Sequence, residues 1–338
     1  MNDLTIPSSL LSQYPFIATE LQKTQGVLSS IHSFEDIERI FLQGQGLSAH
    51  TYRSYLTAVK QFYEFTGGLN PLQVTPALIE MFYDYLVKNH SRNTAYLRIY
   101  GLKKFFQGVK KVLPFYSSPF EGMNKNLKRK LGRRCQGNRT PKALSEDELR
   151  RVLVHLRNDK SLKGLENYAL VLFLATSGLR SDEFCQLTWR DLDYREGRWY
   201  CYFLGKGGYY SEQEVQLQAL GAARSYFQAQ FKRDPLPEDH LFYCLESYRG
   251  KKLSPLSYQV LRFRIKAVGR DVQANGIIKR EMNWSPHLLR RTACTIFYKK
   301  TRDIKATQNF SRHAKADTLI KHYVDSRVST QEVFMTIF

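Results

Sequence analysis

Several side chains in the second half of the chain have the types and spacing needed to cleave a phosphodiester. Such cleavage requires cations on the non-bridging oxygens, a base for the attacking group and an acid for the leaving oxygen. In "ATSGLRSDEF", Arg180 directly follows a predicted helix end, and Glu183 comes three residues later. In "HLLRR", His287 and Arg290 are three residues apart, so they share one face of a helix. The two arginines are therefore candidates for holding phosphate oxygens, a bidentate task that suits a guanidinium.

A lysine, a second histidine and a tyrosine extend this set toward the C-terminal end. Lys206 lies in "LGKGGYY", between two β-prone runs, and His313 and Tyr323 lie ten positions apart in "SRHAKADTLIKHYVD". A phenol has an ordinary pKa of about 10, so it attacks at neutral pH only where its surroundings take the proton or stabilise the phenolate. Each residue alone would more often be an ordinary turn, core or surface residue, since short motifs match by chance. Their occurrence together and in this order favours a phosphodiester-cleaving site.

A helical module is predicted over residues 35–112. Ser48 precedes an amphipathic run that ends at Gly67, Thr75 and Pro76 begin the next helix, and Ser91 begins a third. A shorter helix is expected in "SFEDIERIFL". The basic side chains lie away from the apolar stripes, so we expect this domain to bind DNA through a basic side. The candidate DNA-binding residues of the module and of the segment that follows are Arg53, Lys60, Arg92, Arg98, Lys103, Lys104, Lys125, Lys128, Arg129, Lys130, Arg133 and Arg134.

The composition changes after this module. Residues 113–143 contain Pro, Gly and Ser breaks, and the stretch from Lys125 to Lys142 carries eight basic side chains and no acid. This pattern predicts a basic linker along phosphates, although a solvated tether remains an alternative. Residues 1–34 are expected to be an N-terminal extension, and residues 144–338 a catalytic domain that includes the nucleophile and a tail.

The second domain is predicted to be mainly helical with one β-hairpin. Ser145 and Glu148 form a capping box, and a long apolar helix ends at Gly178. The runs "RWYCYFL" and "YYSEQEVQL" flank a glycine-rich turn and predict the hairpin, and the chain after "SPHLLRR" is helical apart from short breaks. The expected fold class is therefore mainly α with a small β-hairpin or sheet (α+β), in two domains.

The charge of the chain indicates a polyanionic partner. The sequence has 51 Lys and Arg against 31 Asp and Glu, a formal net charge of +20, while its hydrophobic content of 43% supports compact folding. Residues 51–143 alone hold 17 basic and 4 acidic side chains. Such a surplus on a folded chain favours nucleic acid over a membrane surface as the partner.

The remaining composition argues against several other classes. The five cysteines show neither CxxC nor Cys/His ligand spacing, so neither zinc nor a disulfide framework is expected. No run of 18 apolar residues and no apolar leader occur, so we expect a cytoplasmic, nucleoid-associated protein. No carboxylate cluster suits a two-metal nuclease, and no cofactor is predicted.

These stretches resemble the tyrosine recombinase family, also called phage-type integrases, over about residues 35–338. The family pattern is an arginine in T-G-x-R-x-x-E, a lysine on a β-hairpin, H-x-x-R, a further histidine or tryptophan, and a C-terminal tyrosine. Arg180 through Glu183, Lys206, and His287 with Arg290 fit this pattern. The family usually reads L-G-H before its last histidine, whereas this chain has "FSRH" at residues 310–313. In the family, that histidine and the tyrosine are usually nine positions apart, whereas His313 and Tyr323 are ten positions apart.

The resemblance implies a mechanism and a partner. Two domains would clamp duplex DNA at a core site, with the linker crossing between them, and copies would associate as a dimer per site and a tetramer in the synapse. The apolar face of "VSTQEVFMTIF" at residues 328–338 would dock in a neighbouring copy or fold back on its own domain. Tyr323 would form a 3′-phosphotyrosine without metal or ATP. The implied helpers are Arg180 and Arg290 on the phosphate oxygens, Glu183 orienting Arg180, His287 as proton acceptor, His313 on the phosphate and Lys206 as proton donor to the 5′ oxygen.

Three other functions remain open from the sequence. A type IB topoisomerase shares much of this chemistry but relaxes one DNA molecule instead of joining two. A metal-dependent nuclease or transposase would lose its activity in EDTA. A DNA-binding regulator with the same fold would form no covalent adduct with DNA.

Overall fold

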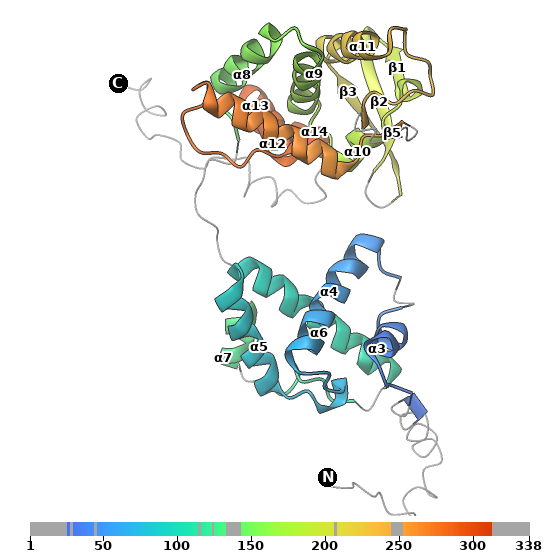
Figure 1. Ribbon diagram of the computed structural model, residues 1–338, viewed down its shortest axis with the longest axis vertical. Helices are drawn as coiled ribbons and strands as arrows, with labels where there is room; N and C mark the ends of the chain where they lie inside the picture. The colour runs from blue at the N-terminus through green and yellow to red at the C-terminus, as the bar shows by residue number, and fades with distance from the viewer. Residues whose placement is uncertain are drawn as a thin grey trace, which may run out of the picture. The chain divides into compact units, whose positions relative to one another are not determined.

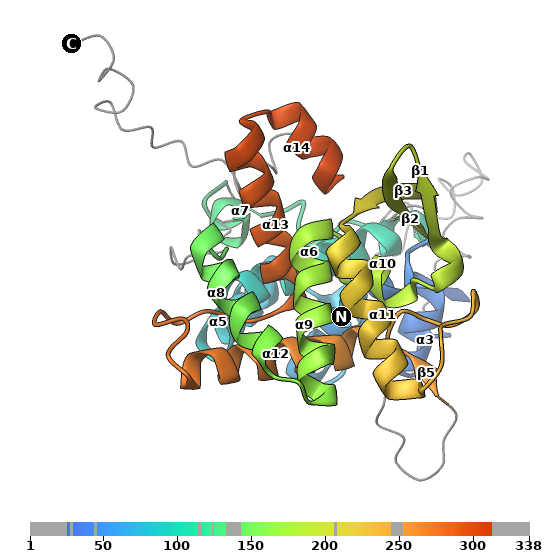
Figure 2. The ribbon, with the colours of Figure 1, turned by 90° about the horizontal axis from the view of Figure 1, so that it is seen from above.

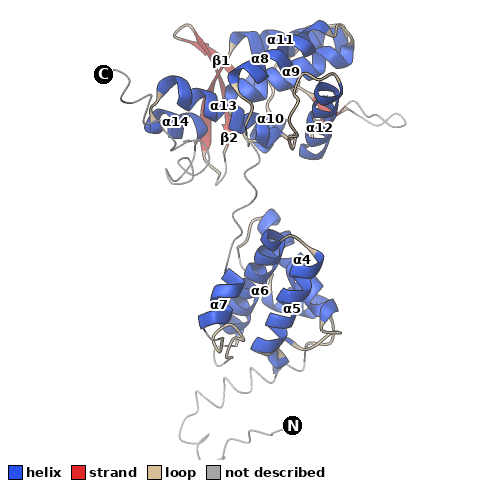
Figure 3. Ribbon diagram, turned by 90° about the vertical axis from the view of Figure 1, so that its left-hand side faces the viewer, coloured by secondary structure: helices blue, strands red, loops and turns tan. Residues whose placement is uncertain are grey.

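The computed structural model describes residues 26–27, 30–43, 46–113, 116–123, 125–132, 143–205, 208–244 and 253–312. The chain divides into two compact units, Met1–Asn138 and Arg139–Phe338. Both units are mostly helical, and the described strands belong to the second (Figures 1 and 3). The predicted fold class is therefore confirmed. None of the described helices is long and apolar enough to cross a membrane.

The first unit is a small helical bundle. Its helices are α3 (Phe34–Phe41), α4 (Ala49–Phe65), α5 (Pro76–Asn89), α6 (Arg92–Val112) and α7 (Lys125–Gly132), with a 3-10 turn at Pro71–Gln73. The hydroxyls of Ser48, Thr75 and Ser91 each accept a hydrogen bond from a backbone N–H of the first turn. These are the N-caps that the sequence predicted, and they satisfy donors that the helix itself leaves unpaired.

Aromatic side chains fill the core of the first unit. Phe62 and Phe82 meet edge to face at 5.1 Å between ring centroids, and Phe41 and Phe105 do so at 5.9 Å. Edge-to-face contacts suit the ring quadrupoles and add to the free energy gained from burial. Helices α4 and α6 approach closely at Gly101, where an added Cβ would lie 3.0 Å from that of Ala58.

Part of the segment placed in the linker by the sequence prediction packs into the first unit. Phe120, Met123 and Leu131 are buried in its core. Lys130 on α7 forms ion pairs with Glu80 and Asp84 of α5, at 3.0 and 2.9 Å. The apolar positions between the basic ones explain the difference: they give α7 a face to bury, so the described residues 116–123 and 125–132 belong to this unit.

The second unit surrounds the apolar helix α9. Its helices are α8 (Glu146–Asn158), α9 (Leu162–Ser177), α10 (Ser181–Gln186), α11 (Leu217–Phe231), α12 (Tyr258–Ala274), α13 (Pro286–Thr301) and α14 (Ile304–Ser311), with a 3-10 turn at Trp189–Asp191. Helix α9 lies between α8 and α11, and it also packs against α13 (Figure 2). All its residues from Ala169 to Ala175 are apolar and buried, so this part of the helix has no polar face. The predicted capping box of Ser145 and Glu148 begins α8.

The predicted hairpin forms two strands of a three-stranded antiparallel sheet. The strands are β1 (Leu192–Arg195), β2 (Arg198–Leu204) and β3 (Tyr210–Val215), in the order β1-β2-β3, and a separate pair joins β4 (Tyr243–Cys244) to β5 (Ser254–Pro255). In β2 and β3, Phe203 lies opposite Ser211, and Cys201 lies opposite Gln213. Cys201, Phe203, Gln213 and Val215 are buried, so this side of the hairpin faces the core.

Candidate active site

Arg180 is the N-cap residue of α10, two residues after α9 has ended at Gly178. Its backbone N–H donates to Oε2 of Glu183 at 2.7 Å, and its Nη1 donates to Oε1 of the same carboxylate at 2.7 Å. Glu183 is buried, whereas about a third of the Arg180 side chain, 34%, is exposed. The carboxylate therefore holds both the backbone and the guanidinium of Arg180, while part of the side chain stays accessible. The orienting role of Glu183 stays a prediction.

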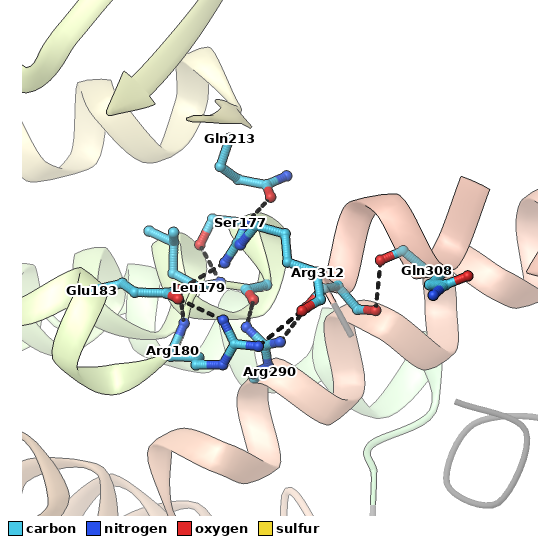
Figure 4. A network of polar contacts seen from close by, with 10 residues as sticks. Ser177, Leu179, Arg180, Glu183, Gln213, Arg290, Gln308 and Arg312 are labelled. Atoms are coloured by element: carbon cyan, nitrogen blue, oxygen red, sulfur yellow. Dashed lines mark hydrogen bonds and ion pairs between the residues drawn. The ribbon is translucent and has the colours of Figure 1, made fainter. Parts of the chain in front are cut away.

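Arg290 lies on α13 and is almost completely buried. Its Nη1 donates to the carbonyl oxygen of Gly178, and its Nη2 donates to that of Ser311. Nη2 of Arg180 donates to the carbonyl of Arg312 at 2.9 Å (Figure 4). The last carbonyls of a helix have no intrahelical partner and lie at its negative end, so the ends of α9 and α14 are suited to hold cations.

A third arginine joins this cluster. Arg312 follows the last residue of α14 in left-handed backbone geometry, with φ of 53°. Its Nη2 donates to Oε2 of Glu183 at 2.7 Å, its Nη1 donates to the side-chain oxygen of Gln213, and its guanidinium lies 4.7 Å from the centre of the Phe203 ring. The sequence prediction did not include Arg312 in the site. The one available signal was a basic residue at the place where the family usually has the glycine of L-G-H.

The cluster has an excess of positive charge. Among the described residues, the guanidiniums of Arg180 and Arg312 both pair with the carboxylate of Glu183, and that of Arg290 lies beside them (Figure 4). Burial lowers the pKa of Arg290 and of Arg312, and the neighbouring guanidiniums lower both further. Burial raises the pKa of Glu183, but Arg312 and Arg180 more than offset this and hold it below its ordinary value. Arginines stay charged at neutral pH in any case, so an anion bound here would gain from the uncompensated charge.

The other predicted catalytic residues are placed less completely. His287 lies exposed in the first turn of α13, one turn before Arg290. Lys206, His313 and Tyr323 lie outside the described residues, as do Arg133, Arg134 and the tail. The structure thus brings together Arg180, Glu183 and Arg290 of the predicted set. His313 directly follows Arg312 in the sequence, and Lys206 lies between strands β2 and β3.

The predicted DNA-binding residues of the first unit differ in exposure. Those with exposed side chains are Arg53, Lys60, Arg92, Lys103, Lys125, Lys128 and Arg129. Arg98 and Lys104 are half-buried, and burial lowers the pKa of Arg98. Lys130 is also half-buried, and its ion pairs with two carboxylates raise its pKa. The exposed residues are therefore better suited to contact phosphates than Lys130 is.

No group of three or more His, Cys, Asp or Glu side chains is arranged to hold a metal ion within the ranges that the structure covers. The described part of the site offers guanidiniums and carbonyl oxygens instead. Guanidiniums hold phosphate oxygens through paired N–H donors. The arrangement can therefore bind a phosphate and stabilise charge that develops on it.

Comparison with known proteins identifies the family. A model described as the phage integrase family matches residues 142–330, and a model of the phage integrase N-terminal SAM-like domain matches residues 37–113. Tyrosine recombinase XerA of Pyrococcus furiosus is 25% identical over 282 residues, which cover 82% of this chain and 84% of that protein. Tyrosine recombinase XerC of Thermodesulfovibrio yellowstonii is 26% identical over 287 residues, which cover 81% and 85%.

Solved structures share the fold. The XerH recombinase bound to palindromic difH substrate aligns with a TM-score of 0.67 and 18% identity, covering 94% of this chain and 88% of that chain. The Tn1549 transposon integrase in complex with transposon right end DNA aligns with a TM-score of 0.65 and 14% identity, covering 90% and 98%. At such identities the likeness shows the fold alone. Because the matching family model spans more than half of the sequence, the chain belongs to the phage integrase family, that of the tyrosine recombinases.

Proposed function

We propose that this protein is a site-specific DNA recombinase that cleaves and rejoins duplex DNA through a 3′-phosphotyrosine on Tyr323. The observation that carries the proposal is the arginine pair. Arg180 and Arg290 are fixed side by side by a buried carboxylate and by the carbonyls at two helix ends. A pair held in this way needs little reorganisation when negative charge develops on a phosphate, which is how preorganised donors lower a reaction barrier.

The proposed reaction conserves the energy of the broken bond. The phenol oxygen of Tyr323 bonds to phosphorus, the bond from phosphorus to the 5′ oxygen breaks, and that oxygen takes a proton. His287 accepts the phenol proton, and Lys206 supplies the proton to the 5′ oxygen. His313 donates to the phosphate. The free 5′-hydroxyl of a partner strand then attacks the phosphotyrosine, so rejoining proceeds without ATP and without a metal ion.

The first unit would supply affinity for duplex DNA. Its exposed basic residues can contact phosphates, which gives salt-dependent binding that does not depend on base sequence. We propose that the two units clamp a core site, with the segment between them crossing the DNA, and that copies associate on DNA as dimers and then as a tetramer. The tail would take part in that association. The place of action would be the nucleoid in the cytoplasm.

The decisive test is to trap the covalent intermediate. The substrates would be duplexes taken from the DNA that flanks the gene. Each would carry a nick close to the cleavage site, so that the short fragment with the free 5′-hydroxyl diffuses away and rejoining is prevented. After incubation with the protein, the products would be separated by electrophoresis in SDS. The wild-type protein should give an SDS-resistant adduct in EDTA, and Tyr323→Phe should bind DNA almost normally and give none, because only the attacking oxygen is lost. Tyr298→Phe is the matched control, since Tyr298 lies on α13, the helix that carries Arg290, and should be dispensable.

The possible results separate the alternatives. An adduct that persists in Tyr323→Phe would show that another tyrosine is the nucleophile. Adduct formation without joining of two plasmids that carry the site would favour a type IB topoisomerase. Dependence on a divalent metal would favour a nuclease or transposase. Tight binding without any adduct would favour a non-catalytic regulator.

A further inference from the structure

Arg312 occupies a backbone position that favours glycine. It follows α14 with φ of 53°, in the left-handed region, where a side chain crowds the following carbonyl. The family usually has a glycine here, which meets that geometry without strain. This chain instead has an arginine at the position, and only 14% of the arginine side chain is exposed. The side chain therefore needs an explanation that helix termination does not supply.

The contacts of Arg312 extend in two directions. On one side Nη2 donates to Oε2 of Glu183, the carboxylate whose other oxygen holds the guanidinium of Arg180. On the other side Nη1 donates to Gln213 of β3, and the planar group lies over Phe203 of β2. Figure 4 shows Arg312 between Gln213 and Glu183. One side chain thus contacts both strands of the hairpin and the carboxylate behind the arginine pair.

Burying Arg312 is energetically unfavourable in two respects, which suggests that its contacts serve a role other than stability. Nε of Arg312 is buried and has no hydrogen-bond partner within the described part of the chain. The charge lies beside two other guanidiniums, and burial lowers its pKa. A buried charge that is only partly compensated contributes little to stability, but it can specify one arrangement of the elements that it joins.

We infer that Arg312 is a positioning residue that sets the β2–β3 hairpin against the arginine pair. Just beyond the ends of the two strands, the Gly205 N–H donates to the Tyr209 carbonyl at 2.8 Å. Because a hydrogen-bonded hairpin moves as one element, fixing Phe203 and Gln213 also fixes Gly205 and Tyr209, which border Lys206 in the sequence. The inference rests on the proposed function for one point: Lys206 is the proton donor to the 5′ oxygen.

The test compares two arginines with the same backbone geometry. Arg302 ends α13 with φ of 54° and is exposed, so Arg302→Gly relieves the same strain without touching the site. Arg312→Gly relieves the strain and removes the bridge. Cleavage would be measured on a normal duplex and on one with sulfur at the 5′ bridging position, because sulfur is a leaving group that needs no proton donor.

We expect Arg312→Gly to cleave the normal duplex at least about tenfold more slowly than the wild type. This is part of the rate enhancement of about 10²–10⁴-fold that general acid catalysis supplies. On the duplex with sulfur at the 5′ bridging position, most of the lost rate should be restored. Arg302→Gly should match the wild type on both substrates. Amides of β2 and β3 should exchange hydrogen faster in Arg312→Gly than in Arg302→Gly. If Arg312→Gly does not fold, Gln213→Met removes only the acceptor on the hairpin and should show the same pattern more weakly.

Lys206→Ala, measured in parallel, separates two kinds of failure. If sulfur does not rescue Lys206→Ala, the proposed role of Lys206 is wrong, and the hydrogen exchange of the hairpin alone decides on Arg312. If sulfur rescues Lys206→Ala but not Arg312→Gly, Arg312 does not act through the hairpin. Unchanged cleavage or unchanged hairpin exchange in Arg312→Gly would also overturn the inference.

Discussion

The guanidinium groups of Arg180 and Arg290 each hold two acceptors at once, which a lysine cannot do. Each donates from two separate nitrogens to acceptors in different segments, and Arg290 does so while almost completely buried. An ammonium carries the same charge on one atom, so it cannot span both acceptors. Substituting either arginine by lysine therefore keeps the positive charge and removes the two-nitrogen geometry, so the variant tests the geometry alone.

We predict that Arg180→Lys or Arg290→Lys lowers the single-turnover cleavage rate by at least about a hundredfold, the scale on which one preorganised charge-stabilising donor acts. DNA affinity should change much less. The matched control is Arg264→Lys on α12, since Arg264 pairs with the buried Glu166 at 2.6 Å instead. A rate within a few-fold of the wild type in either site variant would make these arginines structural.

Local spacing in the sequence predicted Arg180 with Glu183, and the H-x-x-R motif predicted Arg290. Arg180 and Glu183 lie three residues apart, and the geometry of a helix start brings them together. Arg312 could not be predicted in the same way, because its partners Glu183 and Gln213 are far away in the sequence and are brought to it by the fold. The carbonyl acceptors of Gly178 and Ser311 left no signal either, since every residue has a carbonyl.

Among the elements, the junction of α9 and α14 determines where the arginines lie. Gly178 ends α9 with φ of 64°, and a Cβ added there would lie 2.8 Å from the ring of Phe310 on α14. That ring cannot move aside easily, because it stacks on Phe297 at 4.4 Å between centroids. Glycine therefore allows both the turn into Arg180 and the close approach of α14.

Gly178→Ala should destabilise the protein in two ways. The left-handed backbone costs about 1–2 kcal/mol for an L-residue, and the clash with Phe310 adds a further ~1–3 kcal/mol. Gly197→Ala is the control, because Gly197 has φ of 77° but no atom within 4 Å of the added Cβ. Urea unfolding should show the larger decrease in stability for Gly178→Ala, and adduct formation should fall only there. Equal decreases in the two variants would mean that α14 does not depend on this contact.

Local signals predicted the helix starts and the hairpin. The side-chain oxygens of Ser48, Thr75, Ser91 and Ser145 act within three residues of their partners, so their role can be inferred from the sequence. Helix α7 was missed because its basic residues dominate the pattern. The burial of Leu131 depends on the neighbouring α5 and α6, and that information is not local.

Across the whole molecule, the largest surplus of basic side chains and the arginine cluster lie in different parts of the sequence. Residues 51–143 hold 17 basic and 4 acidic side chains, whereas the buried arginine cluster belongs to the second unit. In the proposed function, phosphate contacts of the first unit would release counterions from DNA, so they would set the dependence of affinity on salt. Within the described residues, the arginine cluster has only three guanidiniums, and in the proposed function it would act on a single phosphate.

Neutralising Lys103, Lys125 and Arg129 with glutamine should weaken binding to all duplexes alike. The slope of log affinity against log salt should become shallower by about 0.9 for each phosphate that the variant no longer neutralises. Arg39→Gln shows the effect of removing one positive charge elsewhere, because Arg39 is exposed on α3 and lies outside the predicted DNA-binding set. A decrease in affinity confined to one target sequence would place these side chains at base edges instead.

The acceptors that hold the two arginines have a consequence for how such sites change over evolutionary time. The carbonyls of Gly178, Ser311 and Arg312 belong to the main chain, so exchanging a side chain does not delete them. Alanine substitutions do not remove these carbonyls. Because every residue has a carbonyl, an alignment would show no preference for one residue type at these positions as acceptors. Replacing the peptide bond that follows one of these residues by an ester would weaken that carbonyl as a hydrogen-bond acceptor and leave the side chains unchanged. Side-chain substitutions at residues 178, 311 and 312 of this chain would therefore leave the acceptors of Arg180 and Arg290 in place, provided that the backbone keeps its path.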